Sequence, residues 1–104
     1  MDNNIEHRMV EDVEVVITSY NQGKMIFEAV HSVCEGTVLP SRILIVDDGS
    51  TDKASLDILK EIQKDDSLPV VVEVIHQANG GVSAARNTGI RNTDKPFVLV
   101  LDGG

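Results

Sequence analysis

The chain has 104 residues, with 9 Lys and Arg against 17 Asp and Glu, so its net charge at pH 7 is −8. This length fits one small domain, and 41% hydrophobic residues are enough for a packed core. The acidic balance argues against a nucleic-acid-binding protein, because the excess of Lys and Arg that phosphate contacts need is missing. No apolar stretch approaches the roughly 20 residues of a membrane span. A single cysteine, Cys34, excludes an internal disulfide and favours a reduced, cytoplasmic setting.

Two hydrophobic periods alternate along the chain. Residues 1–12 are polar and are expected to be a disordered lead-in to one domain at 13–104. Runs rich in β-branched residues predict strands at 13–18, 42–47, 70–75 and 96–101. Apolar residues three or four apart predict helices near 24–36, around Leu56, Leu59 and Ile62, and at 82–90. This alternation predicts an α/β fold, a Rossmann-like, mainly parallel four-stranded sheet with helical crossovers. The last strand runs directly into the end of the chain, so we expect these residues to be the front part of a longer protein.

Each predicted strand ends in polar side chains or leads into glycines. In an open parallel sheet, ligands bind beyond the carboxyl ends of the strands. Carboxylates there can bond a base or ribose hydroxyls or hold a divalent cation, and an aromatic ring can stack on a base. Paired glycines ahead of a helix let backbone approach a ligand closely. The strand ends that carry these groups are Thr18–Asn21, Asp47–Ser50, His76–Gly81 and Asp102.

Several common nucleotide and hydrolase motifs are absent from the sequence. It has no Gly-x-x-x-x-Gly-Lys-Ser/Thr phosphate loop, and no Gly-x-Gly-x-x-Gly follows the first strand. The Gly-x-Ser-x-Gly turn of α/β-hydrolases is missing too. These observations disfavour P-loop hydrolysis, dinucleotide chemistry and Ser-based hydrolysis.

Four motifs together resemble family-2 glycosyltransferases of the GT-A fold. They occur in the family's order and spacing. Together with the sequence between them they span most of the chain. The resemblance therefore implies that the chain is a truncated GT-A fold. The motifs are Val15-Val16-Ile17-Thr18-Ser19-Tyr20-Asn21, Ile45-Val46-Asp47-Asp48-Gly49-Ser50-Thr51-Asp52, Asn79-Gly80-Gly81-Val82-Ser83-Ala84-Ala85-Arg86-Asn87-Thr88-Gly89-Ile90 and Val98-Leu99-Val100-Leu101-Asp102.

The resemblance implies a nucleotide-diphospho-sugar donor, usually a UDP-sugar, with Mg²⁺ or Mn²⁺ and inverting transfer to an acceptor hydroxyl. Carried over by position, Thr18 and Tyr20 line the base pocket, with Tyr20 near the uracil ring. Asp48 bonds the base and Asp47 supports the same turn. Arg86 lies near the base and diphosphate, and Asp102 is the first carboxylate of an Asp-x-Asp element that faces ribose and metal.

The resemblance also extends to partners and location. It implies a carbohydrate or lipid-linked acceptor, a role in cell-envelope polysaccharide synthesis, and work in the cytoplasm or at the cytoplasmic face of the membrane. No nucleic-acid partner is expected.

The sequence departs from the family at one position. Gly104 stands where the second carboxylate of the Asp-x-Asp element is expected. The acceptor half and the catalytic base are expected outside these residues, so the chain alone should bind a donor without turnover. Two alternatives stay open: a non-catalytic nucleotide-sugar binding module, which Gly104 favours, and a nucleotidyltransferase of related architecture. The missing Gly-rich, basic loop after the first strand speaks against the second.

A first prediction concerns association. A domain of this size buries about two-thirds of its unfolded surface, and an uncovered last strand leaves apolar sheet surface or an open edge. We therefore expect marginal stability or a homodimer through that surface. Light scattering with thermal unfolding checks this, and a monodisperse monomer with a high melting temperature would contradict it.

Overall fold

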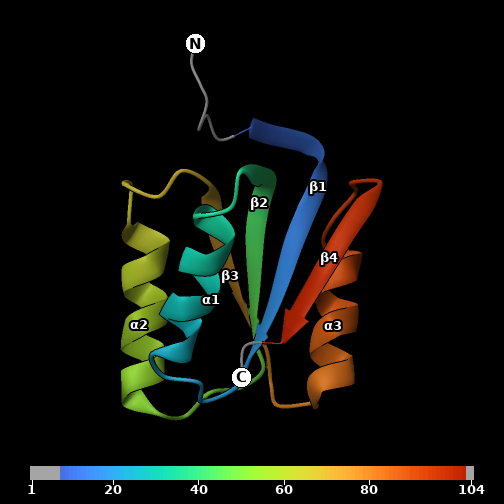
Figure 1. Cartoon of the computed structure of the whole chain (residues 1–104). Coiled ribbons are helices and arrows are strands. Elements are labelled where there is room, and N and C mark those ends of the chain that lie inside the picture. The colour runs from blue at the N-terminus through green and yellow to red at the C-terminus, as the bar shows by residue number, and fades with distance from the viewer. Residues whose placement is uncertain (1–7, 103–104) are drawn as a thin grey trace.

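A computed structural model describes residues 8–102 of the chain, with side chains from residue 12 onward. It contains a four-stranded sheet and three helices (Figure 1). The elements are β1 (Arg8–Ser19), α1 (Met25–Cys34), β2 (Val38–Asp47), α2 (Lys53–Lys64), β3 (Val71–His76), α3 (Val82–Arg91) and β4 (Phe97–Asp102).

The strand order is β3-β2-β1-β4, and all three strand pairs are parallel. This confirms the predicted α/β class and the parallel sheet. Helices α1 and α2 lie together on one face, and α3 lies on the other (Figure 1). All four strands run in one direction, so their carboxyl ends share one edge of the sheet. Thr18 is level with Asp102 on β4, and Ser19 is level with Asp47 on β2.

Two strands begin earlier than the sequence predicted. The first was expected from Val13, but β1 begins at Arg8. Of the expected lead-in, residues 1–7 lie outside the described part and residues 8–12 belong to β1. The second was expected from Arg42, but β2 begins at Val38 and includes Pro40, which is level with Val10. Both extensions lie before an irregularity in the β1–β2 register, which falls between Val10 and Glu14 on β1. Hydrophobic periodicity does not show that a strand continues past such an irregularity.

The core has one layer on each face of the sheet. The larger layer joins α1 and α2 to the sheet through buried aliphatic side chains, among them Ile17, Ile26, Ile43, Ile45, Leu59 and Ile62. The smaller layer, under α3, contains Val16, Leu44, Val46 and Ala85. Helix α3 comes very close to β1 at Gly89, where an added Cβ would lie 2.3 Å from Cγ1 of Val16. Only glycine allows this approach without a shift of the helix.

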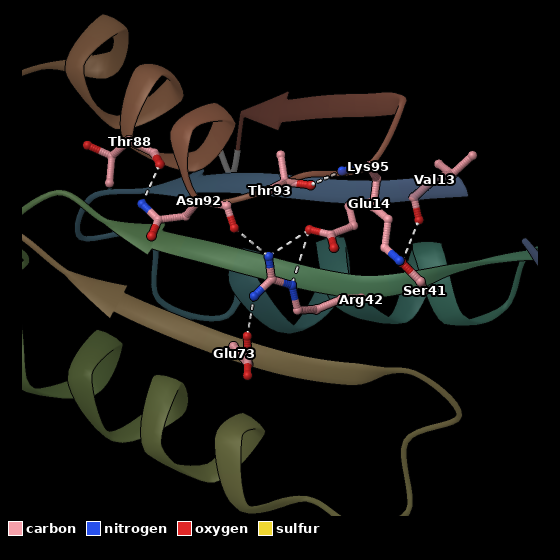
Figure 2. Close-up of polar contacts among 9 residues, drawn as sticks. All are labelled: Val13, Glu14, Ser41, Arg42, Glu73, Thr88, Asn92, Thr93 and Lys95. Atoms are coloured by element: carbon pink, nitrogen blue, oxygen red, sulfur yellow. Dashed lines mark hydrogen bonds and ion pairs between the residues drawn. The ribbon is translucent and has the colours of Figure 1, made fainter. Parts of the chain in front are cut away.

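A charged cluster holds the far end of α3, away from the carboxyl edge. Arg42 on β2 donates to the buried carboxylate of Glu14 on β1, at 2.7 Å from Nη2 and 3.2 Å from Nε, and it also pairs with Glu73 on β3. Its Nη2 donates at 2.7 Å to the backbone oxygen of Asn92, the residue that follows α3 (Figure 2). Arg42 therefore ties three strands to the carboxyl end of α3.

The sheet leaves apolar surface at its margin. Phe97 and Leu99 on β4 are 65% and 53% exposed, and Val71 on β3 is 62% exposed. A mostly apolar groove beside β4, of about 380 Å³, is lined by Val13, Val15, Ser32, Val33, Gly36, Val38, Pro40, Leu99 and Leu101. These surfaces fit the expectation of an apolar sheet margin, while the homodimer itself stays a prediction. Within residues 8–102, no helix has the length and apolar character to cross a bilayer.

The close approach at Gly89 gives a second prediction. Ala is favoured over Gly inside a helix by about 1 kcal/mol, yet the clash with Val16 should outweigh this and lower the free energy of unfolding of Gly89→Ala by about 2 kcal/mol. Urea unfolding measures the change. Ser83→Ala, at an exposed position of the same helix, is the control.

A compensating variant separates packing from other effects. In a Val16→Ala background the two methyl groups that clash are gone and the nearest atom of residue 16 is its Cβ at 3.3 Å, so Gly89→Ala should cost much less than in the unaltered chain. An equal loss in both backgrounds would show that the Val16 contact is not the cause.

Candidate functional site

A pocket of about 340 Å³ lies at the carboxyl edge of the sheet. Its walls come from the ends of β1, β2 and β4, from the loop before α3, and from the first turns of α3. A pocket of this volume is large enough for part of a nucleotide. The lining residues are Thr18, Ser19, Tyr20, Gln22, Asp48, Asn79, Gly81, Val82, Ala85 and Asp102.

Asp48 closes the inner wall, and its carboxylate is fully engaged. Oδ1 accepts from Gln77 Nε2 at 2.8 Å and from the N–H of Gly80 at 2.9 Å. Oδ2 accepts from the N–H of Gly81 at 2.8 Å and from Asn79 Nδ2 at 3.3 Å. Burial would raise the pKa of Asp48, but the bonds from Gln77, Gly80 and Gly81 outweigh it and hold that pKa below its ordinary value. The ionised form of Asp48 thus fixes the β3–α3 loop.

A glycine lets the two loops of this wall meet. Gly49, the residue after Asp48, has φ +82°, and a Cβ there would lie 2.7 Å from the backbone nitrogen of Asn79. Both the left-handed backbone and the lack of a side chain are needed for this contact.

The loop after β1 is fixed by Asn21. Its backbone has φ 50°, a left-handed conformation that Asn tolerates better than most residues. Its Oδ1 accepts from the N–H groups of Thr51 and Asp52, both at 2.9 Å, and its own N–H donates to Ser50 Oγ at 2.8 Å. These bonds hold Tyr20, which is 45% exposed, at the mouth of the pocket.

Asp102 forms the outer, ionic wall with Arg86. Arg86 Nη2 lies 2.5 Å from Asp102 Oδ2 and its Nε 3.3 Å from Oδ1, which also accepts from Thr18 Oγ1 at 2.9 Å. The hydrogen bond from Arg86, then that from Thr18, lowers the pKa of Asp102. The same pairing raises the pKa of Arg86. The pair is nearly half-exposed, so a ligand can reach it.

Asp47 lies behind the pocket. It is 1% exposed, accepts from the hydroxyl of Ser50, and lies 2.9 Å from Nδ1 of His76 through Oδ2. It therefore supports the turn after β2 and is not among the residues that line the pocket.

Four of the six residues expected from the sequence line one pocket: Thr18, Tyr20, Asp48 and Asp102. Arg86 adjoins it through Asp102. Beyond the strand ends that the sequence indicated, the pocket is also lined by Gln22, Val82 and Ala85, which sequence reasoning missed. Gln22 follows the named strand end directly, and Val82 and Ala85 lie in the first turn of α3 after Gly81, so nearness to the named segments was the available signal.

The described residues only partly fit a divalent metal. Among the side chains of residues 12–102, which the structure describes, no three His, Cys, Asp or Glu gather as a metal site. Asp102 is the one expected metal ligand that the structure describes, and its carboxylate is paired with the guanidinium of Arg86. Gly104, at the position of the missing carboxylate, lies outside the described residues.

Comparison with known proteins matches Glycosyl transferase family 2 over residues 14–103. The chain belongs to this family. A glycosyltransferase of Bacillus subtilis named EpsJ, itself uncharacterized, is 35% identical over 91% of this chain. The glycosyltransferase GlyG of Streptococcus pneumoniae is 35% identical over 90%, and an uncharacterized glycosyltransferase of Rickettsia felis is 40% identical over 86%. The chain spans 26%, 30% and 14% of the lengths of these three relatives.

The state of Asp48 gives a third prediction, on pH. Because its pKa is lowered in the folded protein, the bonds it accepts stabilise the fold above its unfolded pKa of about 3.9. That stability is lost as pH falls through the lowered folded pKa. Asp48→Asn should therefore reduce the free energy of unfolding at pH 7 and reduce it less at pH 3. Urea unfolding across this range checks it, with Asp94→Asn, at an exposed position, as control. A penalty independent of pH would contradict the ionic role.

Proposed function

We propose that the chain is the nucleotide-binding part of a glycosyltransferase that takes its sugar from a nucleoside-diphosphate sugar, most directly a UDP-sugar. One observation carries this proposal: an aromatic ring, a polar strand end and a carboxylate line a single pocket at the carboxyl edge of a parallel sheet. The family match supports a glycosyltransferase over a nucleotidyltransferase.

Within this proposal the base stacks on the exposed ring of Tyr20 and faces the wall that Asp48 holds. A direct bond from Asp48 to the base stays a prediction. It would replace the bond from Asn79, which at 3.3 Å is the longest of the four. Thr18 and Arg86 hold Asp102 toward the sugar and phosphate parts of the nucleotide, and Asp47 keeps the turn after β2 in place.

The transfer step is proposed to invert the anomeric carbon, with a base outside this chain removing the proton of the acceptor hydroxyl. Neither carboxylate on the pocket is free for that task, because Asp48 accepts four hydrogen bonds and Asp102 is paired with Arg86. The 104-residue chain is therefore proposed to bind and orient the donor without turnover. Mg²⁺ or Mn²⁺ would offset the charge of the leaving diphosphate, but the described residues do not complete a site for it.

The acceptor and the cellular location are also proposals, which follow from the family resemblance. The acceptor would be a carbohydrate or a lipid-linked saccharide, and the site of action the cytoplasm or the cytoplasmic face of the membrane. A role in cell-envelope polysaccharide synthesis and a homodimer through the sheet margin are likewise proposals.

Calorimetric titration of the chain with UDP gives the fourth prediction. Stacking of a base on an aromatic ring contributes about 1–3 kcal/mol, so Tyr20→Ala should weaken binding about tenfold or more, whereas Tyr20→Phe should retain it. Phe97→Ala, which removes an exposed aromatic ring from β4, is the control and should bind like the unaltered chain. Equal affinity in Tyr20→Ala would contradict the proposed base position, and absence of UDP and GDP binding by the folded chain would contradict the proposed function.

A further inference from the structure

The loop that Asp48 holds contains a chemically labile pair of residues. Asn79 is followed by Gly80, and no other asparagine in the chain precedes a glycine. In such a pair the backbone nitrogen after the asparagine can attack the side-chain amide, because glycine has no side chain to hinder the approach. Asn79 is exposed, so water reaches it. It also lines the pocket at the carboxyl edge, so a change in its chemistry alters the pocket wall.

The reaction is deamidation through a cyclic imide. The backbone N–H of Gly80 loses its proton to hydroxide, and the nitrogen forms a bond to Cγ of Asn79. The Cγ–Nδ2 bond then breaks, and Nδ2 takes a proton from water and leaves as ammonia. Water adds to one of the two carbonyl carbons of the imide and opens the ring to aspartate or isoaspartate. One water is consumed and one ammonia is released, and no oxidant or reductant takes part.

Both reacting groups are bound to Asp48 in the folded chain. The N–H of Gly80, the nucleophile, donates to Oδ1 of Asp48 at 2.9 Å. Nδ2 of Asn79, the leaving group, donates to the backbone oxygen of Asp48 at 3.0 Å and to Oδ2 at 3.3 Å. The nitrogen of Gly80 must therefore give up its bond to Asp48 before it can lose its proton and turn toward Cγ. The negative charge of Asp48 also opposes formation of an amide anion beside it.

We propose that Asn79 is a modification site at which deamidation is controlled by Asp48. The reaction proceeds from the fraction of molecules in which the loop 77–81 has left the Asp48 carboxylate, and the closed loop is protected. Local openings of this kind occur without global unfolding, and reactions of the open form follow its equilibrium population.

The product does not restore the closed loop. An acidic side chain at position 79 brings a second carboxylate to the place where Nδ2 of Asn79 donates to Asp48, and like charges repel. Isoaspartate also adds one carbon to the backbone, where the loop is closely packed: a Cβ on Gly49 would lie 2.7 Å from the nitrogen of Asn79. Deamidation is therefore irreversible and breaks the contact between residue 79 and Asp48 at the inner wall.

Peptide mapping by mass spectrometry tests the proposal by following the mass gain of deamidation at Asn79 at mildly alkaline pH. The folded chain should deamidate there about tenfold or more slowly than the same chain in urea, the factor that one hydrogen bond to a charged group gives. Asp48→Ala, where circular dichroism shows that it is folded, should remove most of this protection. Alanine is used because asparagine would create a second Asn-Gly pair ahead of Gly49.

Two controls distinguish the pair from its surroundings. Gly80→Ala keeps the asparagine but hinders the attacking nitrogen, so it should deamidate slowly both folded and in urea. Asn92 is the internal reference in every sample, because Thr93 follows it and hinders the same attack. In urea, Asn79 should therefore react much faster than Asn92.

Amide hydrogen exchange supplies a measurement that needs no variant. Exchange at Gly80 and attack by its nitrogen require the same release from Asp48. The attack also requires the release of Nδ2 of Asn79. The factor by which folding slows deamidation should therefore equal or exceed the protection factor of the Gly80 amide.

Four results would overturn the proposal. Deamidation as fast in the folded chain as in urea would show that the closed loop gives no protection. An unchanged rate in folded Asp48→Ala would show that another contact controls the reaction. A slower rate in that variant would show that the Asp48 carboxylate is the base that removes the proton of Gly80. Slowing by less than the protection factor would show that the attack occurs within the closed loop. None of these results depends on nucleotide binding.

Discussion

The carboxylate of Asp48 joins two segments on which the whole pocket depends. Asp48 follows β2 directly. Its carboxylate accepts hydrogen bonds from the backbone N–H groups of Gly80 and Gly81, the two residues that immediately precede α3. Four hydrogen bonds compensate for taking this charge out of water. They fix the loop from Gln77 to Gly81 and the start of α3, and with it the helix that carries Arg86. The backbone N–H of Gln77, which donates to the backbone oxygen of Asp47 at 2.9 Å, adds a further bond between the same two segments.

Helix α3 is held at both ends by charges of opposite sign. Asp48 fixes the loop at its amino end, and Arg42 binds the backbone oxygen of Asn92 at its carboxyl end. Between them, Gly89 lets the helix lie against Val16 of β1. Arg86, on the same helix, pairs with Asp102 at the end of β4. The pocket that results has an uncharged side at Ser19, Tyr20 and Gln22 and an ionic side at Asp102. A nucleoside diphosphate has the same two parts.

The fold was largely predictable from the sequence, because β-branched runs and helical periodicity report burial directly. The parallel sheet, the α/β class and the shared carboxyl edge all followed from it. Strand starts were less predictable. Arg8–Val10 pairs with Val38–Pro40 before the irregularity in the register, and an apolar run of two residues beside charged residues or a proline is too short to predict a strand. Among the candidate site residues, Thr18, Tyr20, Asp48 and Asp102 were named from motif position, and all four line one pocket. Motif position could not show that Asp48 is saturated, that Asp47 lies behind the wall, or that Asn79 and Gly80 both bind Asp48. Those properties depend on contacts between segments about 30 residues apart or on the exact course of one loop.

The central claim is that a nucleotide binds at the carboxyl edge of this sheet, against the ends of β1, β4 and the loop before α3. Amide chemical shifts of the labelled chain, followed by NMR during titration with UDP, test it residue by residue. The account predicts shifts confined to residues 18–22, 79–82 and Asp102, with the amides around Arg42 unchanged. Shifts centred instead on the apolar groove beside Leu99, or spread evenly over the sheet, would contradict it.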